Sequence, residues 1–237
     1  MSNFLLKYNV DLVFCIDCTE SMDNVLNIIK RQALSFHGDL LGKMRQKQKN
    51  VDELRVRVVA FRDYAAYARE RKKKLPGNEP MLVTDFFRLP EEAGKLELAV
   101  RSLQPRGGGD DPEDGLEALA YAIRSPWDRS PDAKHRQVIV LWTDAQPHEL
   151  GFGKDSPRYP RGMARNLAEL TAWWGTDFAP GYCDPESRRM VLFAPEEGAW
   201  KFLSEQWDNV IHFPSRAGNG LSELDYETIL NCLSQSI

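Results

Sequence analysis

Three short segments, far apart in the chain, each lead into side chains that carry oxygen atoms. They are residues 10–21, 107–111 and 138–144. The carboxylates and hydroxyls that they present include Asp17, Thr19, Ser21, Asp110 and Asp144. Such hard oxygen atoms are the ligands that Mg²⁺ and Ca²⁺ prefer in proteins. If the three segments end at the same edge of one sheet, the sequence predicts a divalent-metal site there.

The spacing within each segment suits this chemistry. Asp17, Thr19 and Ser21 alternate in a loop, so that their side chains can point the same way. The glycines before Asp110 allow close approach of the backbone, and Asp144 directly follows an apolar run. Mg²⁺ takes six oxygens and usually keeps several waters. The types of ligand do not distinguish Mg²⁺ from Mn²⁺ or Ca²⁺.

Each acid also has an ordinary structural alternative. Asp17 or Thr19 could cap the helix that follows it, and Asp110 could cap the helix expected after Pro112. Asp144 could begin a turn. The metal hypothesis therefore depends on all the segments meeting at one place.

The apolar pattern predicts strands alternating with helices along the whole chain. Apolar or alternating runs indicate strands at residues 10–16, 54–61, 81–83, 137–142, 189–194 and 210–213. Helical spacing indicates helices at residues 22–44, 91–103, 112–123, 163–174, 195–206 and 221–233. Residues 145–162 and 175–185 are expected to be loops.

This alternation predicts an α/β fold in a single domain covering residues 1–237. We expect a doubly wound, mostly parallel sheet of six strands, with one short antiparallel edge strand at residues 81–83 and helices on both faces. In such a sheet, ligands bind beyond the carboxyl ends of the strands, where all three acidic segments would lie.

The ordered trio of motifs resembles the von Willebrand factor type A family. Asp17 to Ser21 match its D-x-[ST]-x-S pattern, the sequence G-G-G-D-D-P-E at 107–113 is similar to a variant of its second loop, and residues 138–144 resemble its third. The motifs cover residues 10–144, and the later alternation fits the remainder of such a domain.

The resemblance implies a metal-ion-dependent adhesion site and a protein partner. Asp17, Thr19, Ser21 and Asp144 would be metal ligands, and Asp110 stands where integrin-type domains have threonine. Its extra negative charge would hold the metal more tightly and reduce the drive to recruit a carboxylate from a partner. The chain also looks like stand-alone bacterial A domains of tellurium-resistance and stress clusters, so that the partner could be a kinase, a phosphatase or another product of a neighbouring gene.

Composition excludes some classes of partner. The 237 residues carry a formal net charge of −4, which disfavours binding to nucleic acid. No apolar run approaches the roughly 20 residues that span a bilayer, and the first residues do not resemble a secretory signal, so we expect a cytoplasmic protein with no membrane partner. Cys15 and Cys18 form a C-x-x-C, but we expect buried thiols because no second pair completes a zinc site.

Three functions fit these residues. The first is a non-enzymatic, metal-dependent interaction domain; the second is a metal-dependent hydrolase or phosphotransfer enzyme using the same acids; the third is a scaffold that no longer binds metal. A hydrolase needs a positioned base, and His148 is the one histidine near an acidic segment, although an exposed loop position is expected for it.

Asp63 is expected to be a surface or capping residue. Trp173 and Trp174 cannot both face one core, so that either one faces a partner or both pack against core and loop.

Overall fold

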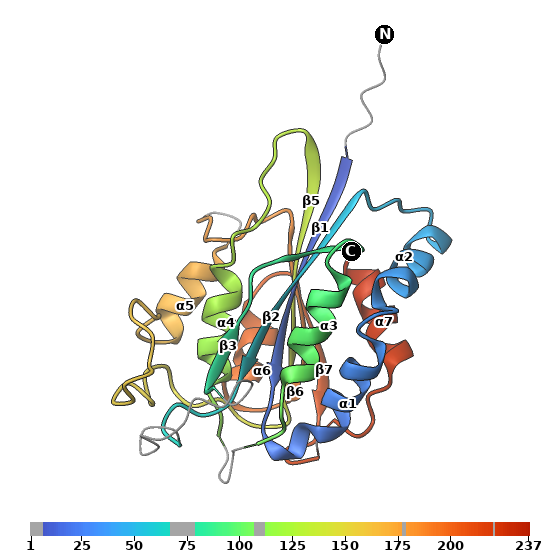
Figure 1. Ribbon diagram of the computed structural model, residues 1–237. Coiled ribbons are helices and arrows are strands. Elements are labelled where there is room, and N and C mark those ends of the chain that lie inside the picture. The colour runs from blue at the N-terminus through green and yellow to red at the C-terminus, as the bar shows by residue number, and fades with distance from the viewer. Residues whose placement is uncertain (1–6, 67–78, 107–111, 177–178, 220) are drawn as a thin grey trace.

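The computed structural model describes residues 7–66, 79–106, 112–176, 179–219 and 221–237 (Figure 1). In these residues the chain folds around one sheet of seven strands, with the order β3-β2-β1-β5-β6-β7 and with β4 also paired to β2. Helices cover both faces of the sheet. The expected α/β doubly wound fold is confirmed.

The centre of the sheet is parallel. Strand β1 (Lys7–Asp17) lies between β2 (Glu53–Phe61) and β5 (Ala133–Trp142) and is parallel to both. Strands β6 (Arg188–Pro195) and β7 (Val210–Ser215) continue the parallel pairing beyond β5. The carboxyl halves of β1, β5 and β6 are mostly apolar and buried, because helices cover both faces of the sheet there.

The expected antiparallel edge strand has two parts. β3 (Met81–Val83) and β4 (Phe87–Leu89) both pair antiparallel with β2, and β4 is the strand beyond the six expected. Thr84 interrupts them: its amide donates to Val58 O, and its hydroxyl accepts from Val58 N at 3.0 Å. At the opposite edge, β7 contains Pro214.

Two groups of helices sandwich the sheet. The helices α1 (Asp23–Gln32), α2 (Phe36–Gln46), α3 (Ala93–Ser102) and α7 (Tyr226–Ser236) line one face, on the right of Figure 1. The helices α4 (Gly115–Ile123), α5 (Leu167–Trp174) and α6 (Gly198–Gln206) line the other. Alternate residues of β1 belong to different cores: Phe14 packs in the first and Cys15 in the second. No helix among the described residues is long and apolar enough to cross a membrane.

Two helix predictions need correction. The helix expected at residues 22–44 is a short 3-10 turn (Glu20–Met22) followed by α1 and α2, with a break at 33–35. At the break Leu34 is exposed, while Ala33 and Phe36 are buried. The helix expected to open at Pro112 begins instead at Gly115, because Glu113 forms a parallel bridge with Pro147.

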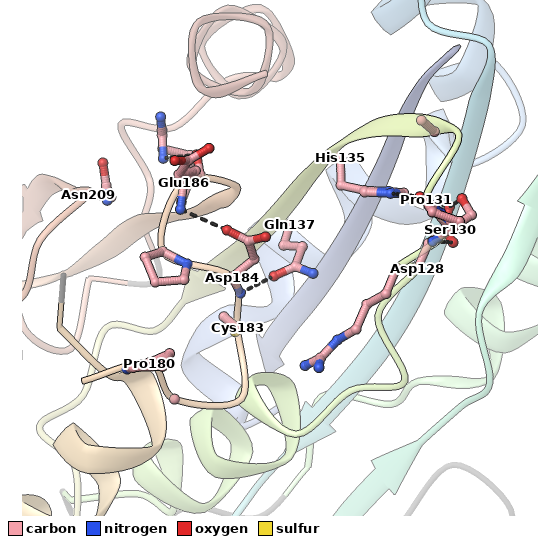
Figure 2. Close-up of a pocket in the computed structure, with 15 residues that line it drawn as sticks. Asp128, Ser130, Pro131, His135, Gln137, Pro180, Cys183, Asp184, Glu186 and Asn209 are labelled. Carbon is pink, nitrogen blue, oxygen red and sulfur yellow. Dashed lines mark hydrogen bonds and ion pairs between the residues drawn. The ribbon is translucent and has the colours of Figure 1, made fainter. Parts of the chain in front are cut away.

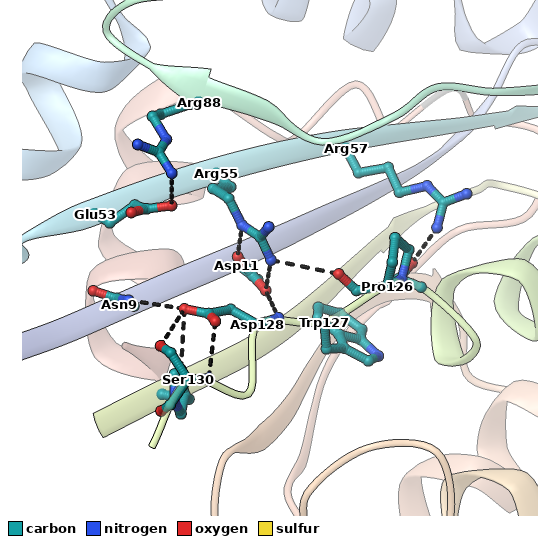
Figure 3. Close-up of polar contacts among 12 residues, drawn as sticks. Asn9, Asp11, Glu53, Arg55, Arg57, Arg88, Pro126, Trp127, Asp128 and Ser130 are labelled. Atoms are coloured by element: carbon teal, nitrogen blue, oxygen red, sulfur yellow. Dashed lines mark hydrogen bonds and ion pairs between the residues drawn. The ribbon is translucent and has the colours of Figure 1, made fainter. Parts of the chain in front are cut away.

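A buried ion pair ties the amino-terminal half of the sheet together (Figure 3). Asp11 of β1 accepts two hydrogen bonds from the Arg55 guanidinium of β2, at 2.7 Å and 2.6 Å, and one from Asp128 N at 2.7 Å. Asp128 in turn accepts from the Asn9 amide at 2.8 Å. These contacts connect β1, β2 and the segment that precedes β5, well away from the carboxyl ends of the strands.

Candidate functional site

The carboxyl end of β1 is the point where the order of the sheet reverses. The chain passes from β1 to β2 on one side and later returns to β5 on the other. In open α/β sheets, ligands bind in the crevice formed at such a switch point. Asp17 is the last residue of β1, and Asp144 lies two residues beyond the end of β5.

Asp17 is fully buried, and three hydrogen bonds hold its carboxylate. Oδ1 accepts from the Thr19 amide at 2.9 Å and from the Thr19 hydroxyl at 2.6 Å. Oδ2 accepts from the Thr143 hydroxyl at 2.7 Å. These bonds fix both carboxylate oxygens between the end of β1 and the end of β5.

The network continues from the first loop to the third. The Ser21 hydroxyl donates to Asp144 Oδ1 at 2.8 Å, and the hydroxyl oxygens of Thr19 and Ser21 lie 3.4 Å apart. The structure therefore brings together four of the five predicted ligands: Asp17, Thr19, Ser21 and Asp144. The fifth, Asp110, lies outside the described residues. Their role as metal ligands stays a prediction.

The electrostatics of this cluster favour a cation. Burial raises the pKa of Asp17 to about 6; the hydrogen bonds from Thr19 and Thr143 oppose this rise, and the nearby Asp144 carboxylate adds to it. Asp144 is itself 1% exposed, and among the described residues Asp17 forms no ion pair with a basic side chain. Two buried carboxylates with hydroxyls around them are a donor set that fits a hard divalent ion.

A second polar cluster lies beside the first. Asp63, Asp114 and His148 are all buried, and each offers one ligand atom within 4.8 Å of those of the other two. His148 Nε2 lies 4.0 Å from Asp63 Oδ1. Such a group could hold a metal ion. Asp63 also follows β2 by two residues, and Phe61 of β2 lies opposite Asp17 in the sheet, so that the two clusters occupy neighbouring strand ends.

The expected exposure of two of these residues was wrong. His148 is buried rather than exposed, with its ring stacked on that of Phe152 at a centroid distance of 3.9 Å. Asp63 is also buried, although the capping alternative holds, since it accepts hydrogen bonds from the amides of Ala65 and Ala66. Asp114 directly precedes α4, and its side chain makes no cap hydrogen bond there.

Backbone hydrogen bonds between distant loops bring the second cluster together. Glu113 N donates to Gln146 O at 2.9 Å, and His148 N donates to Glu113 O at 2.8 Å. The loop after β5 thus pairs with the segment that precedes α4. Sequence spacing gives no signal of this pairing; the nearest hint is that both segments adjoin acidic residues.

A large open cavity lies at the opposite end of the sheet (Figure 2). Its volume is about 1000 Å³, and it is lined near the starts of β5 and β6 by residues that include His135, Gln137 and Asp184. Asp184 N donates to Gln137 Oε1 at 2.8 Å, and Asp184 Oδ1 accepts from Glu186 N at 2.9 Å. These polar groups bond to one another, and none of the predicted ligands lines this cavity.

The other predicted features are part of the core. Cys15 and Cys18 are buried free thiols; Cys15 packs in one core and Cys18 in the other. Trp174 is fully buried and stacks on Trp207 with ring centroids 5.4 Å apart. Trp173 is partly buried, with its ring edge-on to that of Tyr182. The packing alternative for the tryptophan pair therefore holds.

Comparisons with known proteins support the fold. No protein-family model matches the sequence, and no curated protein matches it. Among solved structures, the pilus adhesin SpaC from Lactobacillus rhamnosus GG is similar over 96% of this chain, with 12% identity and a TM-score of 0.53. Its open conformation gives a TM-score of 0.51. This chain covers 30% of the adhesin's length.

A third structure, the vWF domain of the type V pili tip protein Mfa5 from Porphyromonas gingivalis, is more distant. It covers 60% of this chain, and this chain covers 39% of it, with 20% identity and a TM-score of 0.35. The similarity to SpaC, at 12% identity, shows a common fold, and at that level it does not carry function from one protein to the other.

Proposed function

We propose that this chain is a von Willebrand factor type A domain that binds a divalent cation and, through the same face, a protein partner. The ligands would be Asp17, Thr19, Ser21, Asp110 and Asp144, and Mg²⁺ is the expected ion, with Mn²⁺ or Ca²⁺ as alternatives. The observation that carries the proposal is the hydrogen bond between Ser21 and Asp144, at 2.8 Å, because it joins the two loops that would have to share one ion.

The cation would supply positive charge and coordination positions that a partner's oxygen atom can occupy. The chain's own residues do the rest. Asp17 is held rigid by the Thr19 and Thr143 hydrogen bonds, so that little ordering is required when an ion binds. Ser21 and the neighbouring Glu20 are exposed, which places the outer side of the cluster at the surface.

A face for a partner surrounds this cluster. It would comprise residues 17–22, residues 107–113, of which 107–111 lie outside the described part, and the loop at 145–162. In that loop the Phe152 ring is 57% exposed, and an exposed aromatic side chain is a common anchor of protein interfaces. A kinase, a phosphatase or another product of a neighbouring gene is the proposed partner, in the cytoplasm.

The cation is tested by thermal unfolding with Mg²⁺ and with a chelator. An ion present at 100 times its dissociation constant adds about 2.7 kcal/mol of stability, which a melt detects readily. We expect Mg²⁺ to raise the melting temperature of the wild type and of Asp132→Asn, whose exposed carboxylate is remote from the cluster, but not that of Asp17→Asn. No shift in any of the three proteins would support the scaffold without metal, and an equal shift in all three would contradict binding at the Asp17 cluster.

The partner is tested by affinity capture with and without chelator. We expect at least one protein to be retained in Mg²⁺ by the wild type and lost both with chelator and with Ser21→Ala. A partner protein that is retained equally with chelator and by Ser21→Ala would contradict binding through the ion.

A metal-dependent hydrolase is the second candidate, and one observation favours it. His148 is buried beside Asp63, and an imidazole oriented by a carboxylate is a common general base. Mg²⁺-dependent turnover of p-nitrophenyl phosphate distinguishes the two functions. Turnover that Asp17→Ala abolishes would overturn the interaction domain in favour of the enzyme.

A further inference from the structure

We propose that Asp63, Asp114 and His148 form a second cation site, separate from the Asp17 site. This site would select a divalent metal that readily takes nitrogen ligands, such as Zn²⁺. The three residues come from three segments: the turn after β2, the residue before α4 and the loop after β5. A cation there would bind these segments together beneath the proposed partner face. The site does not depend on whether the Asp17 cluster binds an ion.

The geometry permits a single ion to reach all three side chains. The ligand atoms lie within 4.8 Å of one another. An ion at the centre of three such atoms is at most about 2.8 Å from each, and bonds from Zn²⁺ to oxygen and nitrogen are about 2.0–2.2 Å long. Small side-chain rotations close that difference.

The backbone holds the carboxylates in place, as the outer contacts of metal ligands usually do. Asp63 accepts from the amides of Ala65 and Ala66 at 2.6 Å and 3.0 Å. Asp114 Oδ2 accepts from Tyr64 N at 2.5 Å. One short turn, residues 63–66, therefore orients both acids.

Two buried oxygen atoms in this region have no hydrogen-bond donor among the described residues. They are Asp114 Oδ1 and Glu117 Oε2, and both side chains are 0% exposed. A buried carboxylate oxygen without a partner is costly, and a bound cation removes that cost. This observation, rather than the number of acidic residues, is what indicates a ligand.

Acidic side chains gather around these atoms. Glu117 Oε1 accepts from Gly151 N and from the Tyr159 hydroxyl, each at 2.9 Å, and its carboxylate adds to those of Asp63 and Asp114. Burial, together with the nearby carboxylates of Glu117 and Asp63, raises the pKa of Asp114 to about 8, although the hydrogen bond from Tyr64 N opposes the rise. Among the described residues, no lysine or arginine forms an ion pair with these three acids.

The donor set decides which metal is expected. The Asp17 cluster offers only oxygen atoms, which suit Mg²⁺. The second cluster adds an imidazole nitrogen, which favours Zn²⁺ and similar ions over Mg²⁺. The two sites should therefore respond to different metals.

Equilibrium dialysis against Zn²⁺, followed by metal analysis, tests the site. We expect one tightly held equivalent in the wild type, at least a tenfold loss of affinity in His148→Gln and in Asp63→Asn, and no loss in Asp17→Asn. His135→Gln is the matched control, because His135 lies at the opposite end of the sheet, where its Nε2 contacts Ser130 O. Equal binding by the wild type and His148→Gln would overturn the proposal.

The outcomes separate this site from the proposed function. Zn²⁺ lost only in Asp17→Asn would place the metal in the first cluster and overturn the second site. A Zn²⁺ equivalent that depends on His148, with no response of the wild type to Mg²⁺, would support the second site and contradict the first. The visible absorption spectrum of Co²⁺ bound to the wild type is a test that needs no variant. Strong absorption would support a site with few ligands, nitrogen among them. The faint spectrum of octahedral oxygen coordination would overturn the second site.

Discussion

The Ser21 hydroxyl donates a hydrogen bond to Asp144 Oδ1 at 2.8 Å, across 123 positions of sequence. This contact joins the loops that follow β1 and β5. Because Ser21 is exposed while Asp17 is buried, the two ends of the same network can be tested separately.

Ser21→Ala should weaken the binding of Mg²⁺ without unfolding the protein. The substitution removes one oxygen ligand and the bond to Asp144, so we expect at least a tenfold loss of affinity, or about 1.4 kcal/mol. Stability without added metal should change by less than about 0.5 kcal/mol, because the side chain is at the surface. Isothermal titration measures the affinity, with Ser35→Ala as the control, because the exposed Ser35 hydroxyl donates to Gln32 and is not part of the Asp17 cluster. Unchanged affinity in Ser21→Ala would remove Ser21 from the ligand set.

Asp110→Thr should bind Mg²⁺ more weakly than the wild type. The aspartate adds a negative charge where integrin-type domains have a neutral threonine, and a charge at short range stabilises a bound cation strongly. We expect about a tenfold difference, or about 1.4 kcal/mol, in the same titration. Affinity in the wild type that is equal to or weaker than that of the variant would count against this interpretation of Asp110.

Asp11→Ala should be among the most destabilising substitutions in the sheet. It leaves the Arg55 guanidinium without its carboxylate and Asp128 N without its acceptor. Removing one partner of a buried pair costs about 3 kcal/mol or more, which urea unfolding measures. Asp132→Ala is the control, since its pair with Lys7 is exposed and 3.9 Å long, and it should cost less than about 1 kcal/mol. A loss of stability in Asp11→Ala as small as that in Asp132→Ala would show that the Asp11–Arg55 pair contributes little to stability.

The stability contributed by Asp225 should depend on pH. This residue caps α7: its carboxylate accepts from Thr228 N at 2.7 Å, and that bond lowers the pKa of Asp225. Because the pKa is lower in the folded state, the ionised group stabilises the protein above the unfolded pKa, which is near 4, and the contribution is lost as pH falls through the folded value.

Melting temperatures of the wild type and Asp225→Asn between pH 7 and pH 3 check this expectation. The asparagine oxygen can still accept the hydrogen bond but carries no charge to interact with the helix N-terminus. The wild type should be more stable at pH 7, and the difference should shrink toward pH 3. A difference that stays constant over this range would contradict the role of the charge.

The sequence allowed the first cluster to be predicted because its members sit at strand ends. Apolar runs locate the carboxyl ends of β1 and β5, and parallel pairing then brings Asp17 and Asp144 to one edge. The alternation of strands and helices could also be predicted, since the central strands β1, β5 and β6 have apolar carboxyl halves that are buried on both faces.

The second cluster was not predictable, because it depends on contacts that leave no periodic pattern. His148 reaches Asp63 through backbone bonds between the loop after β5 and Glu113. The same bridge keeps Pro112 out of α4. The break before α2 was not predictable either, because the helical spacing of apolar residues continues through it.

The two edges of the sheet are poor templates for adding a strand from another molecule. On one side, Thr84 uses its own amide and hydroxyl to bond with β2 and so breaks the edge into two strands of three residues each. On the other, Pro214 removes an amide donor from β7. Short, interrupted edges and edge prolines discourage intermolecular β-pairing. Copies of this chain can thus be present at high local concentration without their sheets joining edge to edge.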